Sequence, residues 1–96
     1  NKQKELELRE RLRLYMMQFI QNEYGSITIT KENLNDLNVL SIPLANARAI
    51  YEDNEHMIAI CNEYGLDYSK LLNEASNQIA DYYINKCNSQ SEDLPF

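Results

Sequence analysis

Apolar residues recur every three or four positions in three long segments of the chain, residues 3–24, 42–64 and 68–86. This spacing gathers them on one face of an α-helix, so each segment is predicted to be an amphipathic helix. The predicted inward-facing residues are Leu8, Leu12, Tyr15, Met16 and Phe19 in the first segment, Leu44, Ala47, Tyr51, Ile58 and Cys61 in the second, and Tyr68, Leu72, Ala75, Ile79 and Tyr82, supported by Leu71 and Tyr83, in the third. Because the first half of the first segment is poor in apolar residues, we expect those turns to project or to pack on a partner.

The residues between these segments carry helix start and stop signals. Residues 26–30 alternate polar and β-branched side chains, which favours a short extended stretch. Thr30 is a suitable N-cap for a short helix over residues 31–38, and Ser41 followed by Pro43 predicts the start of the next long helix. The polar run at residues 52–56 interrupts the apolar pattern of the second long helix, where we expect a bend or a split.

A nine-residue likeness, MQFIQNEYG at residues 17–25 and MIAICNEYG at residues 57–65, places two glycines at equivalent positions. The likeness fails on both sides, and two copies are too few for a solenoid. We interpret it as two helix ends, in which Gly25 and Gly65 adopt a left-handed conformation just past the helix. Leu66 is then expected to fold back on Ile60 or Cys61.

Together these signals predict an all-α fold, a compact bundle of three long helices and one short helix with an extended segment at residues 26–30. Only two glycines and two prolines are present, too few for a fold rich in β-turns. We expect one helical domain over residues 1–87 and a flexible C-terminal tail over residues 88–96, because the tail has no periodicity.

The net charge of −6 is unevenly distributed, with +2 in residues 1–20 and −8 in the rest of the chain. An acidic body repels phosphate backbones, so nucleic-acid binding is disfavoured, whereas a basic protein surface would suit it. No apolar run reaches the roughly 18 residues that span a bilayer. The two cysteines fit neither a metal site nor a secreted disulfide framework, which predicts a cytoplasmic protein without a membrane segment.

Catalytic and metal chemistry find little support in the sequence. His56 is the sole histidine, and although Glu52 and Asp53 share its helix face, a di-metal site would need a second Glu-x-x-His pair. Cys61 lies on an apolar face, where a buried inert thiol is expected, and the glycines form no phosphate-binding loop. We therefore predict no enzyme activity, no catalytic residue, no metal and no cofactor.

The remaining interpretation is a non-catalytic protein-binding or regulatory module of the adaptor or inhibitor type. Its asparagine-rich composition is typical of an AT-rich genome, which suggests a phage or mobile element. Tyrosine and arginine are enriched at protein interfaces. The candidate contact residues are Arg9, Arg13, Tyr51, Tyr82 and Tyr83. The partner is another protein, or a second copy of the chain packed through the first or last helix.

An alternative interpretation is a small dimeric DNA-binding regulator. In outline, residues 30–50 resemble a helix-turn-helix, with a recognition helix that begins at Ser41. Lys31, Asn46 and Arg48 would then contact DNA. Arg48 is the sole cation of that helix, which argues against this alternative because phosphate contacts supply much of the affinity for DNA.

Overall fold

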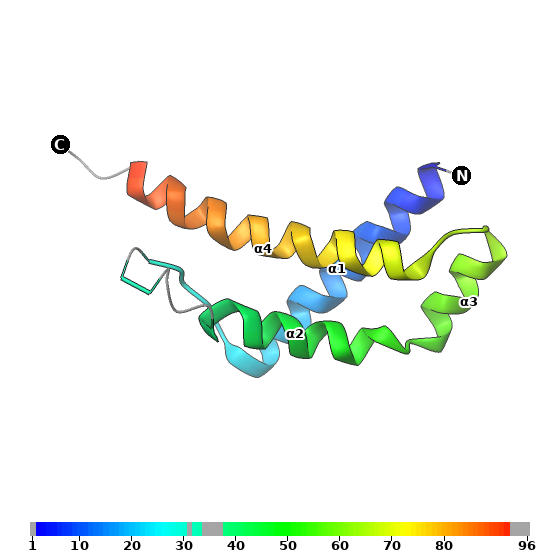
Figure 1. Cartoon of the computed structure of the whole chain (residues 1–96), viewed down its shortest axis with the longest axis horizontal. Coiled ribbons are helices and arrows are strands. Elements are labelled where there is room, and N and C mark those ends of the chain that lie inside the picture. Colours follow the sequence, from blue (N-terminus) through cyan, green and yellow to red (C-terminus); the bar gives the residue numbers. More distant parts are fainter. Residues whose placement is uncertain (1, 31, 34–37, 93–96) are drawn as a thin grey trace.

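The computed structural model describes residues 2–30, 32–33 and 38–92, with side chains as far as Lys86. These residues form four α-helices and no strand: α1 (Lys2–Tyr24), α2 (Asn38–Glu52), α3 (Glu55–Glu63) and α4 (Tyr68–Glu92) (Figure 1). The prediction of an all-α bundle is therefore confirmed. The predicted short helix over residues 31–38 lies almost entirely outside the described residues, and Asn38 is instead the first residue of α2.

Three of the helices, α1, α2 and α4, pack against one another in pairs, and the pair of α1 and α4 is the most extensive. The short α3 joins α2 to α4 at one end, and α4 runs along most of the length of the molecule (Figure 1). The bundle measures 53 × 25 × 20 Å and its radius of gyration is 15.2 Å. A rounded domain of this length would have a radius of gyration of about 12.5 Å. The bundle is therefore elongated, and much of each helix lies near the surface.

The core is built on an i, i+4 row of α1, in which every member is fully buried. The row consists of Leu8, Leu12, Met16 and Ile20. The other buried apolar residues are Ile29, Ala47, Met57, Cys61, Leu71, Leu72, Ala75, Ile79 and Tyr83. Two residues of the predicted α1 stripe lie at its flank instead, since Tyr15 is 41% exposed and Phe19 is partly buried.

The adjacent tyrosines of α4 correct the predicted stripe of that helix. Tyr83 is 5% exposed and packs in the core, whereas Tyr82, which the periodicity assigned to the core, is 46% exposed. Neighbouring residues are about 100° apart around a helix, and here the direction of Tyr82 lies at the flank of the buried face. Tyr83 continues the i+4 spacing of Ala75 and Ile79, and Tyr82 meets its ring edge-to-face at 5.3 Å. α4 also continues past its predicted end at residue 86 to Glu92, so it overlaps the predicted tail, whose flexibility stays a prediction.

The predicted helix over residues 42–64 is divided into α2 and α3, as the polar run suggested. The division occurs at Asn54, whose side-chain oxygen accepts a hydrogen bond of 3.0 Å from the amide of Met57 and so caps α3. The predicted start at Ser41 is wrong, because α2 begins at Asn38 and Pro43 lies inside it, buried. Proline lacks an amide, so the cost of this position is one helix hydrogen bond, and burial of the ring against the core offsets that cost.

The two glycines of the repeated NEYG sequence both adopt the left-handed conformation, with φ of 70° at Gly25 and 68° at Gly65. They nevertheless end their helices differently. At Gly65 the amide of Leu66 donates to the Cys61 carbonyl at 2.8 Å and the Gly65 amide donates to the Asn62 carbonyl at 3.3 Å, which is a Schellman motif. At Gly25 one 3.0 Å bond runs to Gln21. The following residue explains the difference, because Leu66 packs on the core and Ser26 is exposed.

Thr30 makes N-cap-like hydrogen bonds at the end of the segment over residues 26–30, and the helix that it was predicted to cap stays a prediction. Its side-chain oxygen accepts a hydrogen bond of 3.2 Å from the amide of Asn33, and its own amide donates to the Asn33 side chain at 2.7 Å. This reciprocal pair is the geometry of a helix-capping box. Ile29 is buried and Ile27 is partly buried, so the segment also covers one end of the core.

The side chain of Tyr68 fastens the start of α4 to the end of α2. Its hydroxyl donates a hydrogen bond to the backbone carbonyl of Tyr51, and burial raises its pKa from 10.0 to about 12. Because the unfolded chain releases this proton near pH 10, the resulting stability is present in full below that pH and is lost as the pH rises towards 12.

We expect this alkaline loss to amount to about 1–2 kcal/mol, less than the full shift implies because the ring is only partly buried. Urea unfolding at several pH values between 10 and 12 measures it, with Tyr68→Phe as the comparison. The variant should show a smaller decline in stability over this range, whereas parallel curves would contradict the assignment.

Candidate functional site

The two arginines predicted to bind a partner form ion pairs within the chain. Arg9 of α1 pairs with Glu74 of α4, and Lys70 lies 3.9 Å from the same carboxylate and 3.4 Å from Glu5. This alternating chain of charges joins α1 to α4. Arg13 pairs with Glu10 one turn earlier and lowers the pKa of that carboxyl through its hydrogen bond. Arg9 therefore helps to join α1 to α4, whereas Arg13 is paired within α1.

The three tyrosines predicted to bind a partner occupy unlike environments. Tyr51, at the end of α2, is partly buried and stacks on Tyr15 with the ring centroids 6.0 Å apart. Tyr82 is exposed, with the ammonium of Lys86 5.9 Å from its ring centroid. Tyr83 is buried and has little surface to offer a partner. The predicted contact residues are thus spread over three helices and many of their surfaces face the chain itself.

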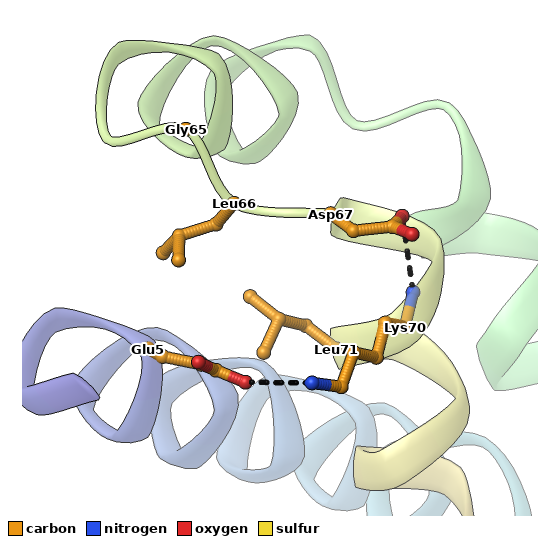
Figure 2. A pocket seen from close by; sticks show the side chains of 6 residues that line it. All are labelled: Glu5, Gly65, Leu66, Asp67, Lys70 and Leu71. Carbon is orange, nitrogen blue, oxygen red and sulfur yellow. Dashed lines mark hydrogen bonds and ion pairs between the residues drawn. The ribbon is translucent and has the colours of Figure 1, made fainter. Parts of the chain in front are cut away.

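The first turns of α1 border two shallow pockets of about 240 and 250 Å³ that share the Glu5–Lys70 ion pair. Figure 2 shows Glu5 and Lys70 pointing towards each other, with Leu66 and Leu71 behind them. The ammonium of Lys4 also lies 4.9 Å from the ring centroid of Tyr64. These turns therefore contact the corner between α3 and α4 rather than project from the bundle, whereas packing on a partner stays a prediction.

These pockets are poor candidates for an active site. Each is below the roughly 300–1,000 Å³ typical of ligand sites. The first is lined by Glu5, Gly65, Leu66, Asp67, Lys70 and Leu71, and the second by Lys2, Glu5, Leu6, Arg9 and Lys70. Glu5 and Lys70, which line both, are paired with each other, and neither pocket is lined by a histidine, a cysteine or a serine. The two pockets are shallow depressions where α1 meets the start of α4.

The remaining reactive side chains are dispersed. Cys61 is fully buried in α3, and burial raises the pKa of its thiol, with a smaller contribution from the negative charge of Asp67. His56 is exposed on the same helix. In the described part of the chain, no three His, Cys, Asp or Glu residues lie close enough to hold a metal ion. No helix in that part is long and apolar enough to cross a membrane.

Burial of Cys61 predicts a protected thiol. In a Cys87→Ser variant, whose single thiol is Cys61, we expect reaction with a water-soluble disulfide reagent to be at least roughly 10³-fold slower than in urea, because exposure requires the core to open. The absorbance of the released thiolate measures both rates. A native rate close to the unfolded rate would show that Cys61 is accessible and would reopen a catalytic role.

The two described residues assigned to DNA under the alternative, Asn46 and Arg48, lie on different sides of α2. Lys31 lies outside the described residues. Asn46 and Arg48 are both exposed on α2, but residues two apart point about 200° away from each other around a helix. Asn46 also donates a hydrogen bond to the hydroxyl of Tyr24. Moreover, Asn38 and Val39, which would form the turn of a helix-turn-helix, belong to the first turn of α2. The recognition helix proposed to begin at Ser41 is therefore not the helix observed.

A surface that the sequence reasoning did not select lies on α2, beside its buried residues Pro43 and Ala47. We call it the α2 outer face: Ile42, Ala45, Asn46, Ala49 and Ile50. Ile42 is 49% exposed and Ile50 is 54% exposed. Tyr24, 40% exposed, extends this face through its hydrogen bond with Asn46. The signal in the sequence was an apolar pattern on both sides of one helix, with Ile42, Ala45 and Ala49 at i, i+3 and i+7.

The α2 outer face is nearly free of charge in a chain of net charge −6. Arg48, the sole charged residue between residues 38 and 51, is exposed and borders this face beside Ala45. An uncharged, half-exposed apolar helix face is the arrangement found at the centre of protein interfaces. Comparisons with models of protein families, with curated proteins and with solved structures find no significant match.

Proposed function

We propose that the chain is a non-catalytic protein-binding module that docks on its partner through the α2 outer face. The observation that carries this proposal is the half-exposed pair Ile42 and Ile50 on a helix that also contributes Pro43 and Ala47 to the buried interior. Burying both side chains would contribute roughly 1–2 kcal/mol each at the exposed fractions observed. Such a module acts in the cytoplasm by occupying a surface of its partner, as an adaptor or an inhibitor does.

A protein fits the α2 outer face better than DNA does. DNA would require cations beside the helix that enters its groove, and α2 supplies one arginine, followed by Glu52 and Asp53 at its end. The apolar side chains of Ile42 and Ile50 have no counterpart on a phosphate backbone. The same side chains would fill shallow apolar depressions on a protein.

Site-specific crosslinking tests the proposed surface. A photoreactive amino acid is placed at position 49 in the α2 outer face, and at position 14 as the control. Leu14 suits this purpose because it is 53% exposed on α1, between charged and polar neighbours. After irradiation in an extract of the producing cells, we expect a discrete protein adduct from position 49 and none from position 14.

A second comparison uses Ile50→Glu and Leu14→Glu, two substitutions at positions of nearly equal exposure, 54% and 53%. The first should abolish the adduct when the crosslinker remains at position 49, and the second should preserve it. Equal labelling from both crosslinker positions, or an adduct that survives Ile50→Glu, would refute docking through the α2 outer face.

A further inference from the structure

We infer that the partner seated on the α2 outer face is a second copy of the same chain, packed antiparallel about a two-fold axis at Asn46. This inference rests on the proposed function and names its partner. It is supported by the shape of the face, by the charges at the ends of α2 and by the area available.

The α2 outer face is complementary to itself in shape. Ile42, Asn46 and Ile50 follow one another at i+4 spacing and form a raised row on the helix. Ala45 and Ala49 form the next row, which is low because their side chains are single methyl groups. Two α-helices pack by placing the row of one into the groove beside the row of the other, and two i+4 rows cross at about −50°. The same face can thus supply both the row and the groove.

Antiparallel packing gives this contact one register. Positions 42 and 50 lie equally far from position 46. A two-fold axis through Asn46 therefore places Ile42 of each copy against Ile50 of the other, which gives two equivalent contacts. Asn46 itself is then beside its equivalent. A polar residue at one position of an otherwise apolar helix contact is a known means of fixing register.

The charge of the helix ends favours the same orientation. The first turn of α2 carries no acidic residue and its last turn carries Glu52 without a basic residue, followed by Asp53. A helix N-terminus carries partial positive charge. In an antiparallel pair, the acidic C-terminal end of one α2 lies near the N-terminus of the other, and the two attract each other. Elsewhere two chains of net charge −6 repel each other, whereas none of the five side chains that define the α2 outer face is charged.

The size of the face predicts a weak dimer. α2 has 15 residues and is therefore about 22 Å long. One crossing of two such helices buries less than the roughly 1,200–2,000 Å² found in stable complexes. We therefore expect a dissociation constant on the order of 10–100 μM, with reversible exchange between monomer and dimer.

Sedimentation equilibrium of the purified chain from about 10 μM to 1 mM tests the inference. Wild type and Leu14→Glu should both approach twice the monomer mass of 11.3 kDa as concentration rises. Ile50→Glu should bind its second copy at least about tenfold more weakly. Circular dichroism establishes that each variant is folded.

Disulfide trapping gives an independent test of the register. In a Cys87→Ser background, Asn46→Cys should form a disulfide-linked dimer under mild oxidation, because residues beside a two-fold axis approach each other closely. Arg48→Cys, on the other side of α2, is the control and should remain largely monomeric.

The outcomes separate this inference from the proposed function. A wild-type chain that stays monomeric to 1 mM overturns the second copy as partner, as does equal trapping at positions 46 and 48. If position 49 then still crosslinks a different protein, docking through the α2 outer face stands and only the identity of the partner is wrong. If neither a dimer nor an adduct forms, both proposals fail.

Discussion

Replacing Leu12 by alanine is expected to lower the free energy of unfolding by about 3–4 kcal/mol. Leu12 is fully buried in the row of α1 that faces the rest of the bundle, so the substitution removes apolar contacts and leaves a cavity between helices. A chain of this length is stable by roughly 5–14 kcal/mol in total. One truncation therefore removes about a fifth of the stability or more, which urea unfolding followed by circular dichroism measures directly.

Leu14→Ala is the matched control for this experiment. It deletes the same atoms from the same helix two positions away, where the leucine is 53% exposed. We expect a loss below about 0.5 kcal/mol. Similar losses for the two substitutions would mean that α1 is turned differently about its axis, with Leu14 rather than Leu12 in the core.

Enlarging Ala47 to leucine is expected to destabilise the fold by about 1–3 kcal/mol, or more if the helices cannot separate. Ala47 is fully buried on α2, which packs against both α1 and α4. Helices pack 8–10 Å apart depending on the side chains between them, so three extra carbon atoms must either force α2 outwards or strain the neighbouring side chains. Alanine and leucine have similar helix propensities, and the effect is therefore one of packing.

The control for this second substitution is Ala59→Leu on α3, where the alanine is exposed. It adds the same atoms to a helix surface and should change the stability by no more than about 0.5 kcal/mol. If Ala47→Leu were equally harmless, α2 would not be held closely against the other helices, and the burial of its inner side would have to be reconsidered.

The existence of the helices was readable from the sequence because one buried face imposes a period of 3.6 residues. The details that failed depend on neighbours far along the chain. The apolar spacing of α4 was compatible with burial of both Tyr82 and Tyr83, and only the packing of the other helices determines that Tyr83 is the buried one. Likewise, Pro43 was predicted to lie in the first turn, because rules for neighbouring residues place proline there. They do not take into account the burial of its ring, and α2 begins five residues earlier, at Asn38.

The candidate site was missed for a related physical reason. α2 is apolar on two neighbouring sides, and a sequence pattern cannot state which side the rest of the chain covers. Tyrosines and arginines were selected because of their general enrichment at interfaces. The structure instead places Tyr83 in the core and pairs Arg9 with Glu74, whereas Ile42 and Ile50, ordinary core residues by type, are left on the surface.

The packing of α1 against α4 has a consequence for how the protein is made. Arg9 and Glu74, which join these helices, are 65 residues apart. A ribosome adds roughly 5–20 residues each second, so the apolar row of α1 waits several seconds before α4 emerges to cover it. During that interval the row is available to chaperones and to other nascent chains. The order of synthesis thus makes α1 the segment most exposed to aggregation, although it is among the most completely buried once the bundle has closed.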